Sequence, residues 1–270
     1  MSPIAYALDE SSRALRPLIG TPGSAYLGRP LALPFAIRWA ELRGATGVVV
    51  DTEGIAHRLT NLDRTELGPA TAVWLDATGT QTLLAVAPDQ VRFPNDPPVT
   101  LSAPVAAVAF SQRCAILATN ADDIATLHRL CADRPTELQS LRTFPGLAIT
   151  ALAIAGDSLF AAARAQRQIL HIREPFGSSP AATFDTEAPP IALAAPSPSG
   201  VLAAFEDNPR LLALPSRDWI DLPTPPDRLQ WLSNGRLLAC SAVNIDQPLL
   251  VLDLAQDRNA FFIPLTRSEE

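Results

Sequence analysis

The sequence contains no lysine: all 21 basic residues among its 270 are arginines. This absence excludes any chemistry that needs a lysine side chain, such as Schiff-base formation, a phosphate-loop lysine or the serine–lysine pair of some hydrolases. The sequence also lacks an apolar run of about 18 residues, and no basic segment followed by an apolar one opens it. We therefore expect no membrane insertion and a cytoplasmic protein, while an extracytoplasmic location stays open if a leader has been removed.

A concentrated positive charge is also missing. The formal net charge is −7, the isoelectric point is near 5.0, and the arginines are scattered singly. Nucleic-acid binding draws most of its affinity from a basic face that displaces counterions. We therefore expect neither a nucleic-acid partner nor binding to an anionic membrane surface.

Cysteine is rare, with Cys114, Cys131 and Cys240 forming an odd set that has no C-x-x-C pair. Neither a disulfide framework nor a zinc knuckle is supported, and buried thiols are the expected state. Cys114 and Cys131 could face each other if their strands were neighbours. Catalytic signatures of the G-x-S-x-G, H-E-x-x-H, G-x-G-x-x-G and P-loop kinds are absent, so nothing in the sequence supports nucleophilic hydrolysis.

What the sequence does contain is a repeat of about 35 to 44 residues. Each unit has an apolar strand, a turn, a second strongly apolar strand, a third strand with Arg or His, and often a fourth. The first strands are residues 35–39, 71–75, 106–110, 149–153, 191–195 and 228–232. The second strands are residues 48–51, 83–86, 115–118, 159–162, 201–204 and 237–240. Such continuous apolar runs are typical of strands that are buried on both faces.

Four short strands per repeat of this length indicate the blade of a β-propeller. The segment 190–203, PIALAAPSPSGVLA, resembles the turn that opens blades in YVTN/NHL-type and WD40-like propellers, and residues 233–239 are a weaker echo. The resemblance covers most of residues 30–265 and implies a propeller without assigning a subfamily. The Gly-His…Trp-Asp pair of true WD40 blades and the double glycine of kelch blades are both absent.

We therefore expect one all-β domain over residues 1–270, with four antiparallel strands in each blade. Residues 1–28 form a closing N-terminal hairpin and loop, 29–266 form six units, and 267–270 are a tail. The hairpin leaves six or seven blades possible. One segment favours a different structure, because residues 122–131 place apolar side chains at helical spacing behind two aspartates, which indicates a helical turn.

The histidines are His57, His128 and His171, and all three occupy the same place in the third strands of their units. In a propeller, equivalent positions on third strands are too far apart to share one metal ion through bonds of about 2.0 Å. We expect half-exposed histidines on blade surfaces.

Three tryptophans, Trp39, Trp74 and Trp231, share one place in first strands. At a channel mouth they could stack on a flat ligand, a glycan or a partner, whereas between blades they would be core, which is the favoured interpretation.

Carboxylates follow the inner strands at Asp51, Asp76, Asp122, Asp157 and Asp207. Metal-dependent lactonase-type propellers gather ligands at such positions, so a channel cation such as calcium, held by Asp76 and Asp157, is the alternative to simple turn formation.

No catalytic residue and no cofactor are predicted. The favoured function is a non-enzymatic scaffold that binds a protein partner, with an accessory subunit of a larger complex as one form of it. The alternatives are a metal-dependent propeller hydrolase and small-ligand binding at the tryptophans. Because Arg favours bidentate and stacking contacts, Arg58, Arg92 and Arg129, which recur at nearly one blade position, are the expected contact residues beside the tryptophans.

Overall fold

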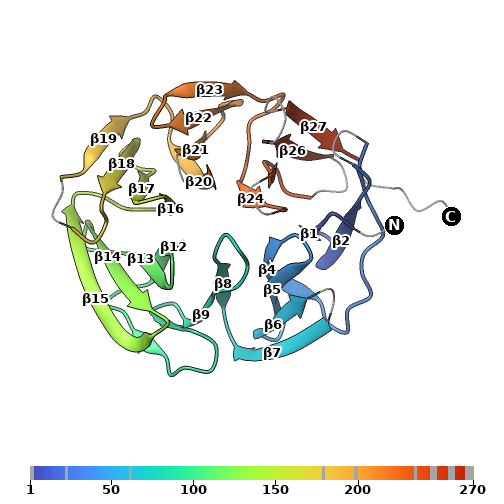
Figure 1. Cartoon of the computed structure of the whole chain (residues 1–270), viewed down its shortest axis with the longest axis horizontal. Helices are drawn as coiled ribbons and strands as arrows, with labels where there is room; N and C mark the ends of the chain where they lie inside the picture. The colour runs from blue at the N-terminus through green and yellow to red at the C-terminus, as the bar shows by residue number, and fades with distance from the viewer. Residues whose placement is uncertain are drawn as a thin grey trace. The chain divides into compact units, whose positions relative to one another are not determined.

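The computed structural model describes residues 3–21, 24–60, 63–177, 180–197, 200–233, 236–243, 248–254 and 259–264. Every regular element in these ranges is a β-strand. No helix in the described part of the chain is long and apolar enough to span a membrane. The strands form seven antiparallel sheets, each from a consecutive stretch of sequence (Figure 1). We call them blades 1 to 7 in chain order.

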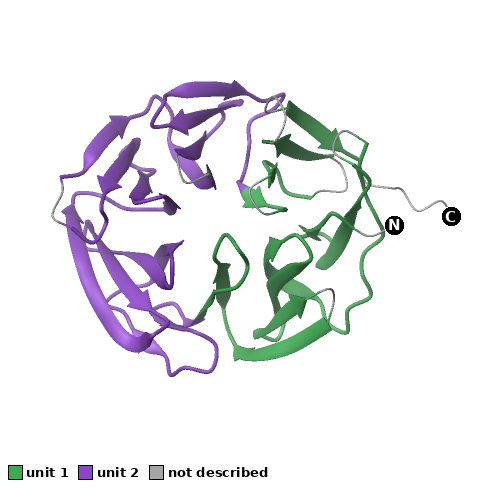
Figure 2. Ribbon diagram, viewed as in Figure 1, with its two compact units in different colours: residues 1–84, 230–270 green, residues 85–229 purple. Residues whose placement is uncertain are grey.

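The chain divides into two compact units (Figure 2). Unit 1 is Met1–Leu84 with Gln230–Glu270, and unit 2 is Ala85–Leu229. Blades 1, 2 and 7 lie in unit 1 and blades 4, 5 and 6 in unit 2, while the boundary falls inside the second strand of blade 3.

The strands of blades 1, 2, 3 and 7 have the following bounds. Blade 1 contains β1 (Ala5–Asp9), β2 (Ala14–Ile19) and β3 (Tyr26–Leu27). Blade 2 contains β4 (Ile37–Arg43), β5 (Thr46–Asp51), β6 (Ile55–Thr60) and β7 (Asp63–Pro69). Blade 3 contains β8 (Ala72–Leu75), β9 (Thr82–Ala87), β10 (Gln90–Arg92) and β11 (Val99–Thr100). Blade 7 contains β24 (Gln230–Trp231), β25 (Leu237–Ala239), β26 (Leu249–Asp253) and β27 (Asn259–Ile263).

The blades of unit 2 have four strands each. Blade 4 contains β12 (Val105–Ser111), β13 (Cys114–Ala121), β14 (Ile124–Cys131) and β15 (Arg134–Pro145). Blade 5 contains β16 (Ala151–Ala155), β17 (Ser158–Ala163), β18 (Gln168–Arg173) and β19 (Ala182–Asp185). Blade 6 contains β20 (Pro190–Ser197), β21 (Gly200–Phe205), β22 (Arg210–Leu214) and β23 (Asp218–Asp221).

The expected repeat is confirmed strand by strand, since the six predicted second strands are the second strands of blades 2 to 7. In β17, for example, every residue after Ser158 is buried. A strand covered on both faces can only be apolar, which is why these runs are continuous rather than alternating. Within each unit the apolar cores lie between consecutive blades, such as the cluster of Phe160, Phe205 and Leu212 between blades 5 and 6.

The N-terminal segment forms a blade of its own, with three strands in the described residues, so the structure has seven blades. Within unit 1 it packs on blade 7, because the backbone N–H of Leu27 donates to the carbonyl of Pro264 at 3.0 Å. Leu18 and Ile263 share the core between these two blades. The N- and C-terminal parts of the repeat therefore meet through main-chain and apolar contacts, as expected for the N-terminal hairpin.

The helical turn expected at residues 122–131 is wrong: the segment is the hairpin turn into β14. Asp122 and Asp123 have positive φ angles of 48° and 60°, and Ala121 pairs with Ile124 across them. Two residues with positive φ make the turn whose twist suits a two-residue hairpin, and Asp is among the residues that tolerate it. The aspartates mimic a helix cap in the sequence but form a turn.

The expectation of three free thiols is wrong as well, because Cys114 and Cys131 form a disulfide with a Cα–Cα distance of 4.0 Å. The two residues are direct partners in the β13–β14 register. Cys240 is buried and takes no part in this disulfide. The expected tail, 267–270, lies outside the described residues, as do residues 198–199 and 234–235 of the two turn segments.

Candidate functional site

The three histidines are buried, with exposed fractions of 5% for His57, 4% for His128 and 7% for His171. The expectation of half-exposed histidines is therefore wrong. Each imidazole forms a hydrogen bond inside its own blade: to Asp51 at 2.8 Å, to Thr119 at 3.0 Å and to Ser158 at 3.0 Å. A ring that finds a partner on the neighbouring strand can be buried at little cost, which explains the recurrence of histidine at this place in the blade.

Burial lowers the pKa of His128, and burial together with the charge of Arg173 lowers the pKa of His171. Both groups are neutral in the folded protein at pH values where an unfolded histidine, with a pKa of 6.5, takes up a proton. The unfolded chain then binds more protons, so stability falls as the pH drops below about 6.5. We expect the His128→Gln/His171→Gln variant to lose much of this dependence between pH 6.5 and 5, measured as the urea midpoint. If the urea midpoint of the variant falls between pH 6.5 and 5 as steeply as that of the wild type, the prediction is wrong.

The candidate carboxylates differ in their surroundings. Asp51 is 5% exposed, and its carboxylate accepts hydrogen bonds from His57 and from the backbone N–H groups of Glu53 and Ile55. Burial raises the pKa of Asp51, but these hydrogen bonds outweigh it and the net pKa is lowered. The Asp76 carboxylate likewise accepts from the residues of its own turn, including the backbone N–H of Gln81 at 2.8 Å.

The other carboxylates, Asp122, Asp157 and Asp207, are exposed. Asp122 and Asp207 have positive φ angles of 48° and 53°, as residues of tight turns do. Across the described ranges, no group of three or more His, Cys, Asp or Glu side chains is placed to hold a metal ion.

The tryptophans of the first strands all lie in unit 1. Trp39 on β4 is 40% exposed, so it is not a core residue, and its indole N–H donates to the carbonyl of Val73 at 3.2 Å. Trp74 on β8 and Trp231 on β24 are partly buried. A ring anchored by one edge and exposed on the rest of its surface suits contact with a partner, which was the alternative to the favoured core interpretation.

The three candidate arginines make different contacts. Arg58 on β6 donates to the carbonyl of Gly79 and to the hydroxyl of Thr82, so it joins blades 2 and 3 within unit 1. The Cζ atom of Arg129 on β14 lies 4.8 Å from the centroid of the Phe176 ring, which is 46% exposed. Arg92 is half-buried on β10. Arg58 and Arg129 thus each bridge two consecutive blades of one unit.

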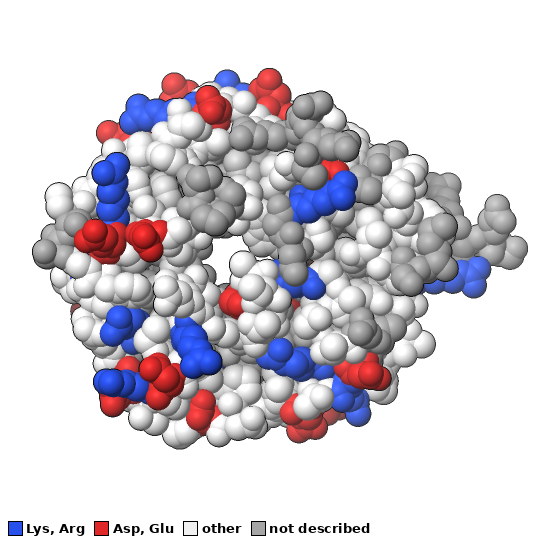
Figure 3. Space-filling model, in the orientation of Figure 1, with Lys and Arg blue, Asp and Glu red and all other residues white. Residues whose placement is uncertain are grey.

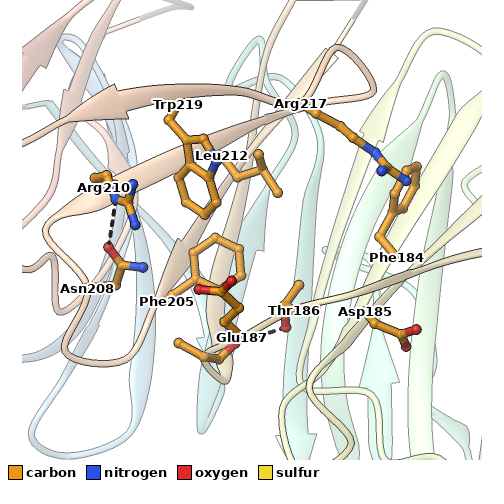
Figure 4. A pocket seen from close by; sticks show the side chains of 11 residues that line it. Phe184, Asp185, Thr186, Glu187, Phe205, Asn208, Arg210, Leu212, Arg217 and Trp219 are labelled. Carbon is orange, nitrogen blue, oxygen red and sulfur yellow. Dashed lines mark hydrogen bonds between the residues drawn. The ribbon is translucent and has the colours of Figure 1, made fainter.

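Sequence reasoning missed a pocket of about 330 Å³ that opens between blades 5 and 6 of unit 2, which we call the blade 5/6 pocket. It lies between the outermost strands β19 and β23 and the loops beside them (Figure 4). Its lining residues are Phe184, Asp185, Thr186, Glu187, Ala188, Phe205, Asn208, Arg210, Leu212, Arg217 and Trp219. The size is at the lower end of the range for ligand pockets.

One wall of the blade 5/6 pocket is built around Trp219, which is 46% exposed. The Cζ atom of Arg210 lies 4.7 Å from the centroid of the indole, and the Phe205 ring lies 5.7 Å from it. The β22–β23 register explains the first contact: Arg210 pairs with Asp221, so Trp219 is its diagonal neighbour. Asn208 accepts a hydrogen bond from Arg210 Nε at 3.4 Å, which holds the guanidinium in place.

The opposite wall repeats this chemistry. The Cζ atom of Arg217, in the turn between β22 and β23, lies 5.1 Å from the centroid of the Phe184 ring on β19. The close-up shows Arg217 and Phe184 on one side of the view and Arg210 with Trp219 on the other (Figure 4). Two acidic residues, Asp185 and Glu187, complete the lining, and Asp185 accepts from the side chain of Gln168 at 2.9 Å.

The repeat pattern does not predict the pocket, because residues of two different blades line it. Several of them lie on fourth strands, which are the least regular strands in the sequence. The available signal was Trp219, the one tryptophan outside the first strands, close in sequence to Arg210 and Arg217. Elsewhere on the visible face, the described arginine and acidic side chains are interspersed and form no broad field of one sign (Figure 3).

Comparison with solved structures decides the fold. A streptogramin B lyase structure matches with a TM-score of 0.66 at 9% identity, covering 88% of this chain and 86% of that chain. The chain is a seven-bladed β-propeller. A nidogen/laminin complex matches this propeller with a TM-score of 0.56 at 10% identity, covering 82% of this chain and 94% of that chain.

A third propeller match is YCF48 bound to D1 peptide, with a TM-score of 0.56 at 12% identity, covering 93% of this chain and 89% of that chain. No protein-family model and no curated protein matches the sequence. Identities this low establish the propeller fold alone, and propellers serve unrelated functions.

Proposed function

We propose that this β-propeller is a non-enzymatic scaffold that binds a protein partner through the blade 5/6 pocket. The observation that supports this function is the pair of arginine–aromatic stacks around an opening of about 330 Å³. Exposed Trp and Arg side chains are the residues that most often carry the binding energy of interfaces. One structural neighbour is bound to a peptide, which is consistent with peptide recognition on this architecture.

An enzymatic role has less support. Ser158 and His171 form a hydroxyl–imidazole pair at 3.0 Å, but the same pair recurs as Thr119 and His128 at 3.0 Å in blade 4. A feature that recurs in successive blades is explained by the blade itself, where it satisfies a buried ring. For the metal-dependent alternative, hydrogen bonds within its own turn already account for the Asp76 carboxylate, and the described residues bring no group of three or more metal-ligating side chains together around it.

The disulfide favours an oxidising compartment over the cytoplasm that the sequence suggests. Disulfides persist in secreted and periplasmic proteins and are rare where thiol reductants keep cysteines reduced. We include an extracytoplasmic location in the proposal on this ground, with the Cys114–Cys131 bond as its support.

The two exposed tryptophans provide a matched test. Trp219 is 46% exposed and Trp39 is 40% exposed, and only Trp219 lines the blade 5/6 pocket. We expect Trp219→Ala to weaken binding of the co-purified partner by about 30-fold, as expected for an interface hot spot of about 2 kcal/mol, while Trp39→Ala leaves it unchanged. The measurement is native mass spectrometry of the purified complex, followed by titration of the separated partner.

Two results would contradict this proposal. If the protein isolated from its own cells is only a free monomer, the scaffold function is wrong. If Trp39→Ala abolishes binding and Trp219→Ala does not, the partner binds at the first-strand tryptophans instead. Thermal unfolding of both variants checks that each remains folded.

A further inference from the structure

We propose that the blade 5/6 pocket recognises an extended peptide with an acidic side chain, and that Arg210 and Arg217 bind its carboxylate. This inference rests on the proposed function and names the chemistry of the partner segment. Three features of the pocket support it. The two guanidinium groups lie over aromatic rings without an ion pair, the charges of the lining sum to zero, and the neighbouring outer strands have an unpaired edge in the described residues.

The two guanidinium groups are held flat and available. Each lies over an aromatic ring, at 4.7 Å for Arg210 on Trp219 and 5.1 Å for Arg217 on Phe184. In the described part of the chain neither forms an ion pair, and both side chains are exposed. Arg210 Nε donates to Asn208, but a guanidinium that lies over a ring keeps its two Nη groups available, and these match the two oxygens of a carboxylate. The stacking also restricts the side chain before the ligand arrives, which lowers the entropic cost of binding.

The charge balance selects a single negative charge. Asp185 and Glu187 line the same pocket as the two arginines, so the formal charges of its lining sum to zero. A carboxylate carries one negative charge and a phosphate nearly two; in a lining with no net charge the phosphate gains no net attraction from its second charge but loses more hydration on binding. Glu187 is exposed at the edge of the opening, where its carboxylate can accept a hydrogen bond from a peptide N–H.

The surrounding strands favour a peptide over a small free acid. β19 pairs only with β18, and β23 pairs only with β22, so each leaves one edge without a strand partner in the described residues. An extended peptide gains main-chain hydrogen bonds at such an edge, and a neighbouring pocket reads its side chains. Trp219, which is 46% exposed, and the partly buried Phe184 supply an apolar surface beside the charged groups, so an apolar residue next to the acidic one completes the match.

The test is selection from a random heptapeptide display library on the full chain, followed by titration of one fluorescently labelled consensus peptide. We expect the enriched peptides to share an acidic residue next to an apolar one, and replacement of the acidic residue by its amide to weaken binding at least tenfold. We expect Arg217→Lys and Arg210→Lys each to weaken binding about fivefold or more, because lysine keeps the charge but loses the planar, bidentate geometry. Arg113→Lys, an exposed arginine between β12 and β13, should bind as the wild type does.

Several outcomes would overturn this inference while leaving the proposed function intact. Enriched peptides without an acidic residue, or equal binding by Arg217→Lys, Arg210→Lys and the wild type, would show that these arginines do not read a carboxylate. Tighter binding of the matched phosphoserine peptide would assign the pocket to phosphate. Free glutamate binding as tightly as the peptide would remove the peptide from the proposal. A library without any enriched peptide also overturns it, whereas the Trp219→Ala comparison on the native partner tests the scaffold function separately.

Discussion

Replacing Asp51 with alanine is expected to destabilise the protein by about 3–5 kcal/mol. The carboxylate is buried and accepts from the backbone N–H groups of Glu53 at 3.0 Å and Ile55 at 2.8 Å, and it binds the His57 ring at 2.8 Å. Alanine would leave several buried polar groups without an acceptor, and each such loss costs about 1–3 kcal/mol. Urea denaturation, read as the shift of the midpoint at constant slope, measures the effect.

The control for Asp51→Ala is Asp157→Ala, which removes an exposed carboxylate from the turn between β16 and β17 of blade 5. We expect it to change stability by less than about 0.5 kcal/mol, as surface substitutions usually do. A loss below about 1 kcal/mol for Asp51→Ala would mean that water replaces the carboxylate, and the buried network would then not hold the blade together.

The hydrogen bonds of Asp51 also make the stability of the protein depend on pH. The pKa of Asp51 is lower in the folded protein than in the unfolded chain, so the folded state is favoured where the carboxylate is ionised. This contribution is fully present above the unfolded pKa near 4 and is lost as the pH falls through the folded value. Asp51→Asn should therefore lose stability at pH 7 and show a shallower decline below pH 4 than the wild type.

The strand order of this propeller could be predicted because each blade repeats one physical requirement. The second strands are buried on both faces, so runs such as 159–162 and 201–204 are apolar without interruption and mark their position in the blade. A polar residue at these places would need its own partner. The number of blades was harder to predict from the sequence, because blade 1 has only three strands in the described residues and does not match the complete repeat.

The exposure of particular side chains could not be predicted in the same way. The histidines can be buried because a polar partner lies on the neighbouring strand, two residues from the residue directly opposite each ring. These partners are Asp51, Thr119 and Ser158, and their placement depends on register. Register also brings Cys114 next to Cys131 and turns Asp122 and Asp123 into a hairpin. If the register of these strands shifted by one residue, each of these contacts would be lost. The loop length fixes the register, and the apolar pattern alone does not determine the loop length.

The lack of lysine acquires a structural meaning in the arginine–aromatic stacks. Among the described residues, five guanidinium groups lie within 6 Å of an aromatic ring centroid, at Arg64, Arg129, Arg142, Arg210 and Arg217. A planar, weakly hydrated guanidinium stacks on a ring, whereas an ammonium holds its water more tightly. Stacking lets the chain place cations on its surface in fixed orientations without burying acidic partners beside them. The blade 5/6 pocket is where two of these stacks face one opening.

Removing the disulfide is expected to cost about 3 kcal/mol, because closing a loop of this size restricts the unfolded chain. Cys114 and Cys131 are 17 residues apart and join the two strands of one hairpin. For a protein of this size the loss corresponds to a fall in Tm of roughly 6–12 °C. Thermal unfolding with and without dithiothreitol measures it, and the Cys114→Ala/Cys131→Ala variant should unfold at the lower temperature in both conditions.

Cys240→Ala is the matched control, since Cys240 is the remaining cysteine and takes no part in the disulfide. Its small cavity should lower the Tm slightly in both conditions, but it should respond to dithiothreitol as the wild type does. Alkylation of the protein as isolated, followed by mass spectrometry, should find one reactive thiol after unfolding and three after reduction. Three thiols without reduction, or a wild-type Tm that dithiothreitol leaves unchanged, would contradict both the stabilisation and the oxidising compartment that the bond supports, because the hairpin would then be held by its strand pairing alone.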